Sequence, residues 1–309
     1  MKKLLLIDGN AILHRAYHAL PALTNKDGMV VNAVYGFFSM LLNVLIDQKP
    51  DYLVVCFDRP KPTIRQTMFA GYHAHRTELP EDFVPQIAIV HDLLAKLKVS
   101  VFELDGFEAD DLIGTISVEA VKGINGLKDT EVVILTGDRD LLQLVNKQVK
   151  VLMPLIGITK TAMFDEAKVE EKYGVHPRQF IDYKALIGDQ SDGYPGVTGI
   201  GPKTASSLLQ KYDTFENLYA KVGELPEKVG LKLATDAEQA ALAKKLATII
   251  IDVPIQFDLA QCSCEDFDGK ALRDAFVEQG FKSLTARWEK FLELEELKPP
   301  VEKEQLELL

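Results

Sequence analysis

The chain has 309 residues, of which 47% are hydrophobic, enough apolar material for one large domain or about two. No run approaches the ~20 consecutive apolar residues of a membrane span. Residues 4–7 are too short an apolar segment for a signal peptide, so none is expected. The net charge, 35 − 46 = −11, argues on its own against a nucleic-acid-binding protein. Without the nine acids that the motifs below place in one site, the balance is 35 − 37 = −2, so bulk charge does not decide the partner.

Three apolar runs along the chain share one form and are interpreted as strands. Each is aliphatic and β-branched without polar alternation, which is typical of parallel strands buried on both faces. These runs occupy residues 3–8, 52–58 and 131–138. Helix-like stretches at 33–48 and 85–98 lie between them, so right-handed βαβ crossovers are expected. Further strands are predicted at residues 99–104 and 149–155.

Each of the three runs ends in an aspartate: Asp8, Asp58 or Asp138. In open α/β sheets ligands bind at the carboxyl ends of the strands, so we expect these carboxylates to converge at one edge. The alternative is that each aspartate only caps the next helix, as aspartate often does in β-to-α turns. A fourth predicted strand is also followed by acids, and this favours convergence.

Those acids lie in residues 107–116, FEADDLIGTI, which place Glu108, Asp110 and Asp111 within four positions at the start of a predicted helix. Acids in a first helical turn are favoured by the helix dipole. That explanation covers one or two of them, but the mutual repulsion of three opposes it. We therefore interpret the segment as one wall of a metal site.

Two more acidic pairs follow, Asp138 and Asp140 in TGDRD, and Asp189 and Asp192 in GDQSD. The i, i+3 spacing of the second pair predicts that both point at one ion from a first helical turn. All-oxygen ligands select Mg²⁺ or Mn²⁺ rather than Zn²⁺, and the six histidines form no HxxxH or HExxH pattern. Nine acids exceed the needs of one Mg²⁺, so two ions roughly 4 Å apart are expected, an arrangement that hydrolyses phosphodiesters.

Two further segments indicate nucleic-acid binding. Residues 195–207, PGVTGIGPKTASS, contain a GxG turn that leads into a helix N-terminus, whose backbone N–H groups can hold a phosphate. Glycine also serves helix-to-helix turns for steric reasons alone, but the complete GIGPKTA is more specific. Residues 59–83 interleave basic and aromatic side chains beside Asp58, which suits a single strand; an ordinary solvated loop is the equal alternative.

In their order these motifs resemble the bacterial 5′ nucleases of the flap endonuclease family, to which the 5′→3′ exonuclease module of DNA polymerase I belongs. The resemblance rests on residues 4–20, 57–58, 108–111, 136–145, 173–192 and 195–205, and continues weakly through 246–255 and 280–284. It implies the PIN-like α/β fold of 5′ nucleases, a mostly parallel sheet flanked by helices. The implied divisions are a nuclease domain at 1–170 with a helical arch near 59–90, a helix–hairpin–helix region at 171–290 and a charged tail or linker at 291–309.

The resemblance also implies a structure-specific 5′→3′ exonuclease or flap endonuclease, which cuts DNA and RNA primers at junctions of a 5′ single strand and a duplex in replication and repair. Two Mg²⁺ or Mn²⁺ ions would be held by Asp8, Asp58, Glu108, Asp110, Asp111, Asp138, Asp140, Asp189 and Asp192. The expected catalytic residues are Asp8, Asp58, Glu108, Asp110, Asp111, Arg65 and His73. DNA would contact Arg15, Arg65, Tyr72, His73, Arg76, Gly199, Gly201, Lys203 and Thr204, with K⁺ at the helix–hairpin–helix.

Two positions depart from the family pattern. His73 stands where the arch normally has a lysine that polarises the scissile phosphate, and because histidine is mostly neutral at pH 7, slower or more pH-dependent turnover is expected. Gly193 stands where the family usually has asparagine, which removes no metal ligand.

The expected partners are DNA with a 5′ flap, nick or primer junction and a DNA polymerase module, fused or separate, and the expected setting is a cytoplasmic, nucleoid-associated monomer. Two alternatives stay open: a DNA-junction binding module with weak cleavage, and a ribonuclease with a related acidic α/β domain.

Overall fold

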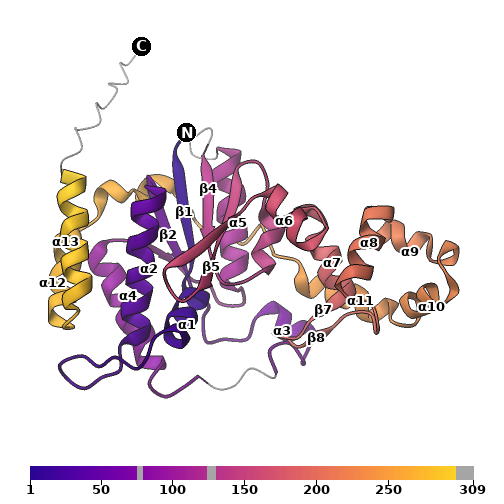
Figure 1. Ribbon diagram of the computed structural model, residues 1–309, viewed down its shortest axis with the longest axis horizontal. Coiled ribbons are helices and arrows are strands. Elements are labelled where there is room, and N and C mark those ends of the chain that lie inside the picture. The colour runs from indigo at the N-terminus through magenta and orange to yellow at the C-terminus, as the bar shows by residue number, and fades with distance from the viewer. Residues whose placement is uncertain (75–78, 124–129, 297–309) are drawn as a thin grey trace, which may run out of the picture.

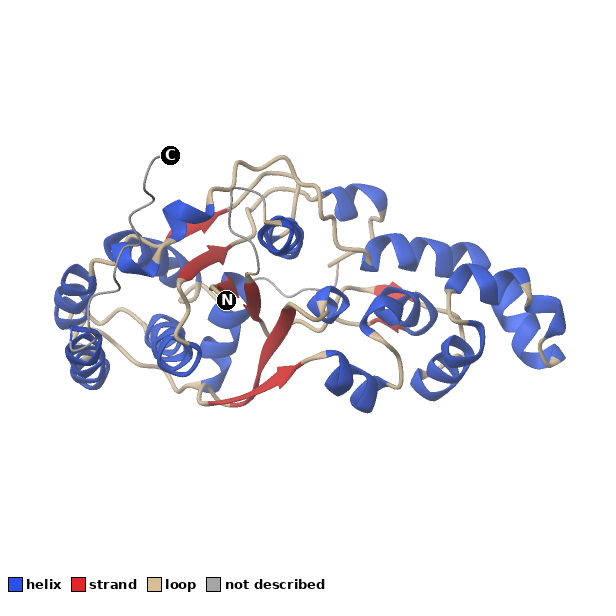
Figure 2. Cartoon of the chain, turned by 90° about the horizontal axis from the view of Figure 1, so that it is seen from above, coloured by secondary structure: helices blue, strands red, loops and turns tan. Residues whose placement is uncertain are grey.

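The computed structural model describes residues 1–74, 79–123 and 130–296, which form an α/β domain and a helical extension beside it (Figure 1). Seen from above, helices lie on both sides of the sheet (Figure 2). Within the described ranges, no helix combines the length and apolar character that a bilayer-spanning segment requires.

One six-stranded sheet forms the centre of the α/β domain, in the order β3-β2-β1-β4-β5-β6. Its first five members pair in parallel, and β6 pairs antiparallel with β5. The strands are β1 (Lys3–Asp8), β2 (Tyr52–Cys56), β3 (Ser100–Phe102), β4 (Glu131–Leu135), β5 (Val149–Ile156) and β6 (Lys160–Phe164).

The strands are apolar throughout because both faces of the sheet are covered. In β1, Leu4 and Leu6 pack into the apolar cluster that includes α5, whereas Leu5 and Ile7 pack into the cluster on the opposite face. All four side chains are fully buried. The opposite face is covered by α1 (Gly9–Ala19), α2 (Asn32–Gln48), α4 (Val84–Leu97), α12 (Gly269–Glu278) and α13 (Lys282–Glu296), and the first face by α5 (Ala109–Lys122).

The helical extension follows β6 and contains a small antiparallel pair of strands, β7 (Gly188–Asp189) and β8 (Tyr194–Pro195). The parallel strands run downward in Figure 1, so their carboxyl ends face α1, the short helix α3 (Ile64–Met68) and the β7–β8 pair. The helices of the extension are α6 (Glu166–Tyr173), α7 (Phe180–Ile187), α8 (Pro202–Tyr212), α9 (Phe215–Ala220), α10 (Glu227–Thr235) and α11 (Ala237–Ala247).

The mostly parallel α/β fold is confirmed, with local corrections. The strand predicted at 99–104 is limited to β3, and β6 was not predicted at all. In the region expected to form a helical arch, near 59–90, the described residues hold the five-residue α3, turns at 70–74 and the first turns of α4, and residues 75–78 lie outside the described chain. The GDQSD segment forms β7 and the turn that leads to β8 rather than the start of a helix. Gly193 has φ of 78° in this turn, a left-handed conformation that glycine adopts without strain.

Candidate active site

The ends of β1 and β2 meet the start of α5, and side-chain hydrogen bonds fix this junction. Asp8 caps α1: its Oδ1 accepts from the Ala11 N–H at 2.9 Å, and its Oδ2 accepts from the Thr136 hydroxyl at 2.7 Å. Asp58 accepts from the Ala109 N–H at 2.7 Å. The sequence posed helix capping and convergence of the strand ends as alternatives. In the structure both apply to these aspartates.

The carboxylates at this junction interact strongly. Burial raises the pKa of Asp8 to about 7, and the nearby charges of Asp58 and Asp138 add to the effect. Burial also raises the pKa of Asp110 well above its ordinary value, reinforced by Asp138, Asp8 and Asp58. Negative charges gathered in a site of low polarity make ionisation costly, and a multivalent cation would relieve that cost.

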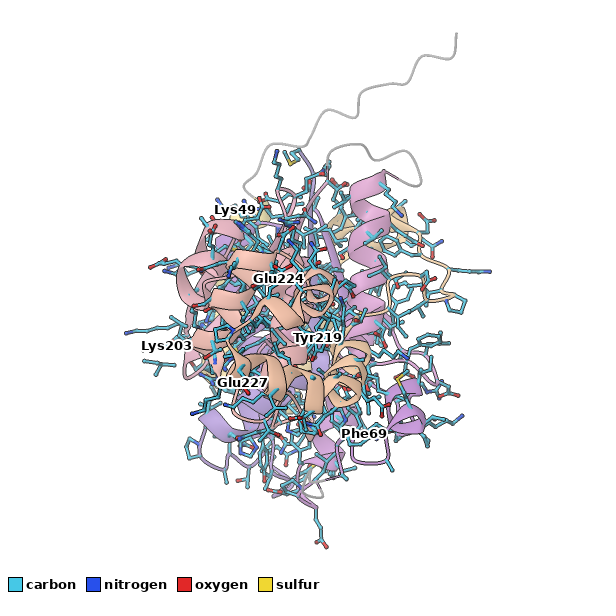
Figure 3. All side chains as sticks on the ribbon, turned by 90° about the vertical axis from the view of Figure 1, so that its right-hand side faces the viewer. Lys49, Phe69, Lys203, Tyr219, Glu224 and Glu227 are labelled. Carbon is cyan, nitrogen blue, oxygen red and sulfur yellow. The ribbon has the colours of Figure 1, made fainter. Side chains whose placement is uncertain are left out.

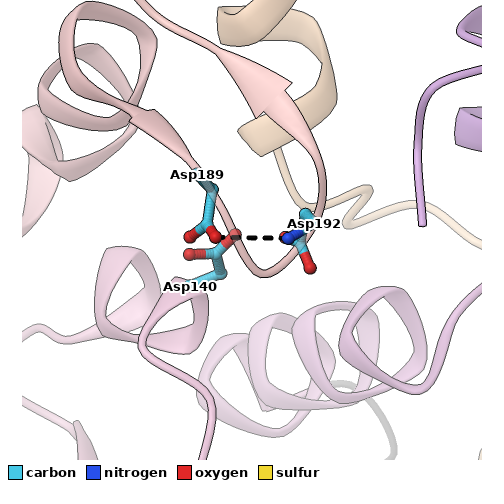
Figure 4. Close-up of side chains that lie close together, drawn as sticks. All are labelled: Asp140, Asp189 and Asp192. Carbon is cyan, nitrogen blue, oxygen red and sulfur yellow. Dashed lines mark hydrogen bonds between the residues drawn. The ribbon is translucent and has the colours of Figure 1, made fainter. Parts of the chain in front are cut away.

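A second group of carboxylates comes from a different part of the chain. One oxygen from each of Asp140, Asp189 and Asp192 can be chosen so that all lie within 4.8 Å of one another. Figure 4 shows Asp140 facing the turn that carries the other two, where the Asp192 N–H donates to Asp189 Oδ1 at 3.2 Å. Burial and the charge of Asp138 raise the pKa of Asp140 to about 8, although the Lys184 ammonium opposes this rise. The set offers carboxylate oxygens alone, which suits a hard divalent cation.

Lys184 is a residue of this group that the sequence reasoning missed. Its buried ammonium lies 2.5 Å from Asp140 Oδ1 and also pairs with Asp189. Burial opposes ionisation of Asp189, but Lys184 outweighs it and lowers the pKa of that carboxyl. A lysine in the mostly apolar helix α7, five positions before Asp189, is the signal that could have identified it.

Arg65, a predicted DNA contact, is engaged within the protein in this structure. Its side chain is only 4% exposed, and all five of its N–H donors are used. They donate to Glu108 Oε2, both oxygens of Asp111, and the carbonyls of Leu246 and Thr248, at 2.7–3.0 Å. Arg65 thus joins the region after Asp58 to the start of α5 and the end of α11, and in this structure it is closed to DNA.

The metal-ligand role of Asp111 stays a prediction, and in this structure the carboxylate is engaged within the protein. This side chain is 1% exposed, and its oxygens accept from Arg65 and from the backbone N–H groups of Glu108 and Ile250. Its lone pairs are directed at protein donors, so it anchors Arg65 rather than lining the site. Sequence spacing could not separate it from Asp110, because both lie in one helical turn.

Tyr72 and His73 also lie against the carboxylates. The Tyr72 hydroxyl donates to Glu108 Oε2 at 3.1 Å, and the ring, 6% exposed, stacks on His73 with centroids 4.0 Å apart. The predicted DNA contact of Tyr72 stays a prediction, and in this structure burial leaves little of the ring accessible. His73 Nε2 lies 3.1 Å from Asp192 Oδ1, so this histidine bridges toward the second carboxylate group.

Comparison with known proteins then decides the family. A family model described as 5'-3' exonuclease, N-terminal resolvase-like domain, matches residues 3–174. A second, described as 5'-3' exonuclease, C-terminal SAM fold, matches residues 175–270. The chain belongs to the 5′-3′ exonuclease family.

Relatives agree with this assignment, and a solved structure shares the fold. DNA polymerase I of Caldicellulosiruptor bescii is 38% identical over 92% of this chain and 33% of its own length. DNA polymerase I of Bacillus subtilis is 39% identical over 93% of this chain and 32% of its own length. The chain thus spans about a third of these relatives. The bacteriophage T5 flap endonuclease, solved with DNA and metal ions, superposes with a TM-score of 0.64 at 21% identity, covering 96% of this chain and 100% of that one.

The remaining residues of this 5′-3′ exonuclease family member that are predicted to contact DNA differ in their surroundings. Arg15 donates to the carbonyls of Leu155 and Gly157 at the β5–β6 turn, at 2.8 and 3.1 Å, so it is engaged within the protein. Arg76 lies outside the described residues. The four predicted hairpin positions lie at or near the surface, with Thr204 half-buried and the others exposed: Gly199, Gly201, Lys203 and Thr204.

Proposed function

We propose that this chain is a divalent-metal-dependent 5′ nuclease that hydrolyses DNA phosphodiesters where a 5′ single strand meets a duplex. The observation that carries the proposal is the meeting of two carboxylate groups, from the strand ends and from the β7–β8 turn, beside a glycine hairpin. The raised pKa values of Asp8, Asp110 and Asp140 support a site built for cations. Mg²⁺ is the proposed physiological ion, and Mn²⁺ should substitute for it.

The proposed ligands are divided between the two groups. Asp8, Asp58, Glu108 and Asp110 would hold one ion, and Asp138, Asp140, Asp189 and Asp192 the other. Asp111 is left out because both of its oxygens accept from Arg65, whereas only one oxygen of Glu108 does. When bound, two such ions supply an activated water and stabilise the leaving oxygen. The chain's own part is orientation: the Thr136 hydroxyl and the Ala11 N–H hold Asp8, and the Ala109 N–H holds Asp58.

Around this centre, we propose that the segment after Asp58 guides the 5′ strand and that the hairpin at 197–201 holds the downstream duplex, with K⁺ as an additional ligand. The division near residue 170, the monomeric state and a role beside a polymerase module in primer removal and repair are parts of the same proposal. The two DNA polymerase I relatives support the last point, because the chain corresponds to one third of each.

A 5′-labelled DNA flap tests the proposal when it is incubated with EDTA, Mg²⁺ or Mn²⁺. We expect a short labelled product only when the metal is present, and Asp110→Asn should abolish it while junction binding is retained. Binding without metal-dependent cleavage would favour the junction-binding module, and preference for an RNA strand would favour the ribonuclease.

A further inference from the structure

Three side chains from the α10–α11 region form hydrogen bonds with the backbone of the glycine hairpin, taken here as residues 196–201. Each reaches a different main-chain polar group, and together they alternate donor, acceptor and donor. The Gln239 amide donates to the Gly196 carbonyl, Asp236 Oδ2 accepts from the Thr198 N–H at 2.7 Å, and the Lys232 ammonium donates to the Gly199 carbonyl at 2.8 Å.

The spacing of these residues explains how one short segment reaches three consecutive parts of the hairpin. Lys232 lies near the end of α10, Asp236 links α10 to α11, and Gln239 lies in the first turn of α11. Steps of four and three residues keep side chains on the same side of a helix. The order 232, 236, 239 therefore runs antiparallel to the order 199, 198, 196 in the hairpin. We call these three side chains the hairpin clamp.

The clamp engages three main-chain groups of the hairpin and leaves two of its N–H groups open. The Val197 N–H donates to the Leu186 carbonyl, and the Ile200 N–H donates to the Val197 carbonyl. By contrast, the exposed N–H groups of Gly199 and Gly201 have no acceptor within the described residues. Lys203, just inside α8, lies at the outer edge of this end of the molecule (Figure 3). Exposed donors and a lysine beside them are the groups that a DNA phosphate needs.

The hairpin sequence would be mobile without such support. Three glycines occur in six residues, 196–201, and Gly199 has φ of 75° in the left-handed region. A β-carbon added there would lie 2.4 Å from the Lys232 ammonium, so glycine and lysine fit together. Ordering a glycine-rich loop during binding costs affinity, whereas a loop ordered beforehand does not bear that cost.

We propose that Lys232, Asp236 and Gln239 are positioning residues that fix the hairpin in its duplex-binding conformation. This inference rests on the proposed function, since it concerns how the same protein holds DNA. Asp236 allows this proposal to be distinguished from an effect of charge. A carboxylate beside a phosphate-binding loop should repel DNA, so charge alone predicts that removing the carboxylate strengthens DNA binding. The hairpin clamp predicts weaker DNA binding for any substitution that loses the acceptor for the Thr198 N–H.

The test compares Asp236→Ala, which loses that acceptor, with Asp236→Asn, which keeps an acceptor and removes the charge. Duplex–junction affinity is measured with the full chain in EDTA, and KM and kcat are measured with Mg²⁺. Asp236→Ala and Gln239→Leu should weaken affinity and raise KM by about threefold to tenfold, the range of one hydrogen bond, with kcat retained. Asp236→Asn should bind at least as tightly as the unsubstituted protein.

Two controls separate this role from others. Gln210→Leu removes a similar amide, which donates to the Gly174 carbonyl, and should leave affinity unchanged. The salt dependence of binding should stay the same in Gln239→Leu, because a neutral positioning residue releases no counterions. Circular dichroism and melting temperature exclude unfolding as the cause of weaker binding.

The outcomes distinguish the two proposals. If the unsubstituted protein neither binds nor cuts a junction, the proposed function fails. If it does both, and Asp236→Ala binds as tightly as Asp236→Asn, the hairpin clamp is overturned and the charge of Asp236 is its only influence.

Discussion

Raising the pH from about 5 to about 8 should destabilise the metal-free protein, and excess Mg²⁺ should remove most of this loss. The reason is that burial raises the pKa of Asp8 from 3.8 to about 7. A carboxyl with a raised pKa holds its proton in the folded state after the unfolded chain has released it. Its contribution to stability is therefore complete below about pH 4 and is lost as the pH rises through about 7.

The size of the effect follows from the shift. About three pKa units at ~1.4 kcal/mol each amount to about 4 kcal/mol for Asp8 over the whole range. About 2.5 kcal/mol of this falls between pH 5 and pH 8. The pKa of Asp140, raised to about 8, changes stability in the same direction. Because Mg²⁺ binds ionised carboxylates, its stabilising effect should be larger at pH 8 than at pH 5.

Urea denaturation across this pH range, with EDTA or with Mg²⁺, measures the effect directly. Asp8→Asn should flatten the metal-free profile, since the amide keeps an acceptor for the Ala11 N–H but does not titrate in this range. Asp92→Asn, an exposed site on α4, should leave the profile unchanged. Metal-free stability that stays level or increases from pH 5 to pH 8 would refute the reasoning, as would equal stabilisation by Mg²⁺ at both pH values.

Three further substitution tests concern the contacts around the site. Arg65→Met leaves the Asp111 carboxylate buried without its partner, so urea denaturation should show a loss of about 3–5 kcal/mol; an unchanged midpoint would contradict the buried pair. Asp111→Asn and Asp110→Asn should move the metal-free melting temperature in opposite directions, down for the partner of Arg65 and up for the crowded acid, and shifts of the same sign would contradict these roles. Lys184→Met should lower metal-free stability at pH 8 but increase the gain in melting temperature on adding Mg²⁺, and an unchanged gain would show that Lys184 does not compete with the ion.

The convergence of Asp8 and Asp58 could be predicted because strand direction places both at one edge of the sheet, whatever the details of packing. The role of Arg65 could not, since its five acceptors lie 43 to 183 positions away along the chain. A basic residue between prolines and aromatics has the same local pattern whether it faces DNA or a buried carboxylate. Only the fold, which brings the end of α11 against α5, decides between the two.

The hairpin shows the same limit at a smaller scale. The GIGPKTA motif predicts an exposed glycine turn that leads into a helix, because glycine and proline constrain local geometry directly. The residues that hold this backbone in place were not predicted, since Lys232, Asp236 and Gln239 look like any polar helix face. Their role depends on contacts with main-chain groups of another segment, and the sequence does not show which main-chain groups a side chain will contact.

The division of charge in the site suggests an order in which its two halves should bind metal. Two cationic side chains already neutralise part of the negative charge of the site. Arg65 lies beside Glu108, and Lys184 lies beside Asp140 and Asp189. Among the described residues Asp8 and Asp110 have no ion pair, and their pKa values are raised; the pKa of Asp140 is raised as well, although Lys184 opposes the rise. A divalent ion at the second group must compete with the Lys184 ammonium, whereas one between Asp8 and Asp110 relieves repulsion at two carboxylates that have no ion pair among the described residues. We therefore expect two Mg²⁺ affinities in calorimetric titration, tighter at the strand ends, and Lys184→Met should narrow the gap between them; a single affinity in the unsubstituted protein would contradict this order.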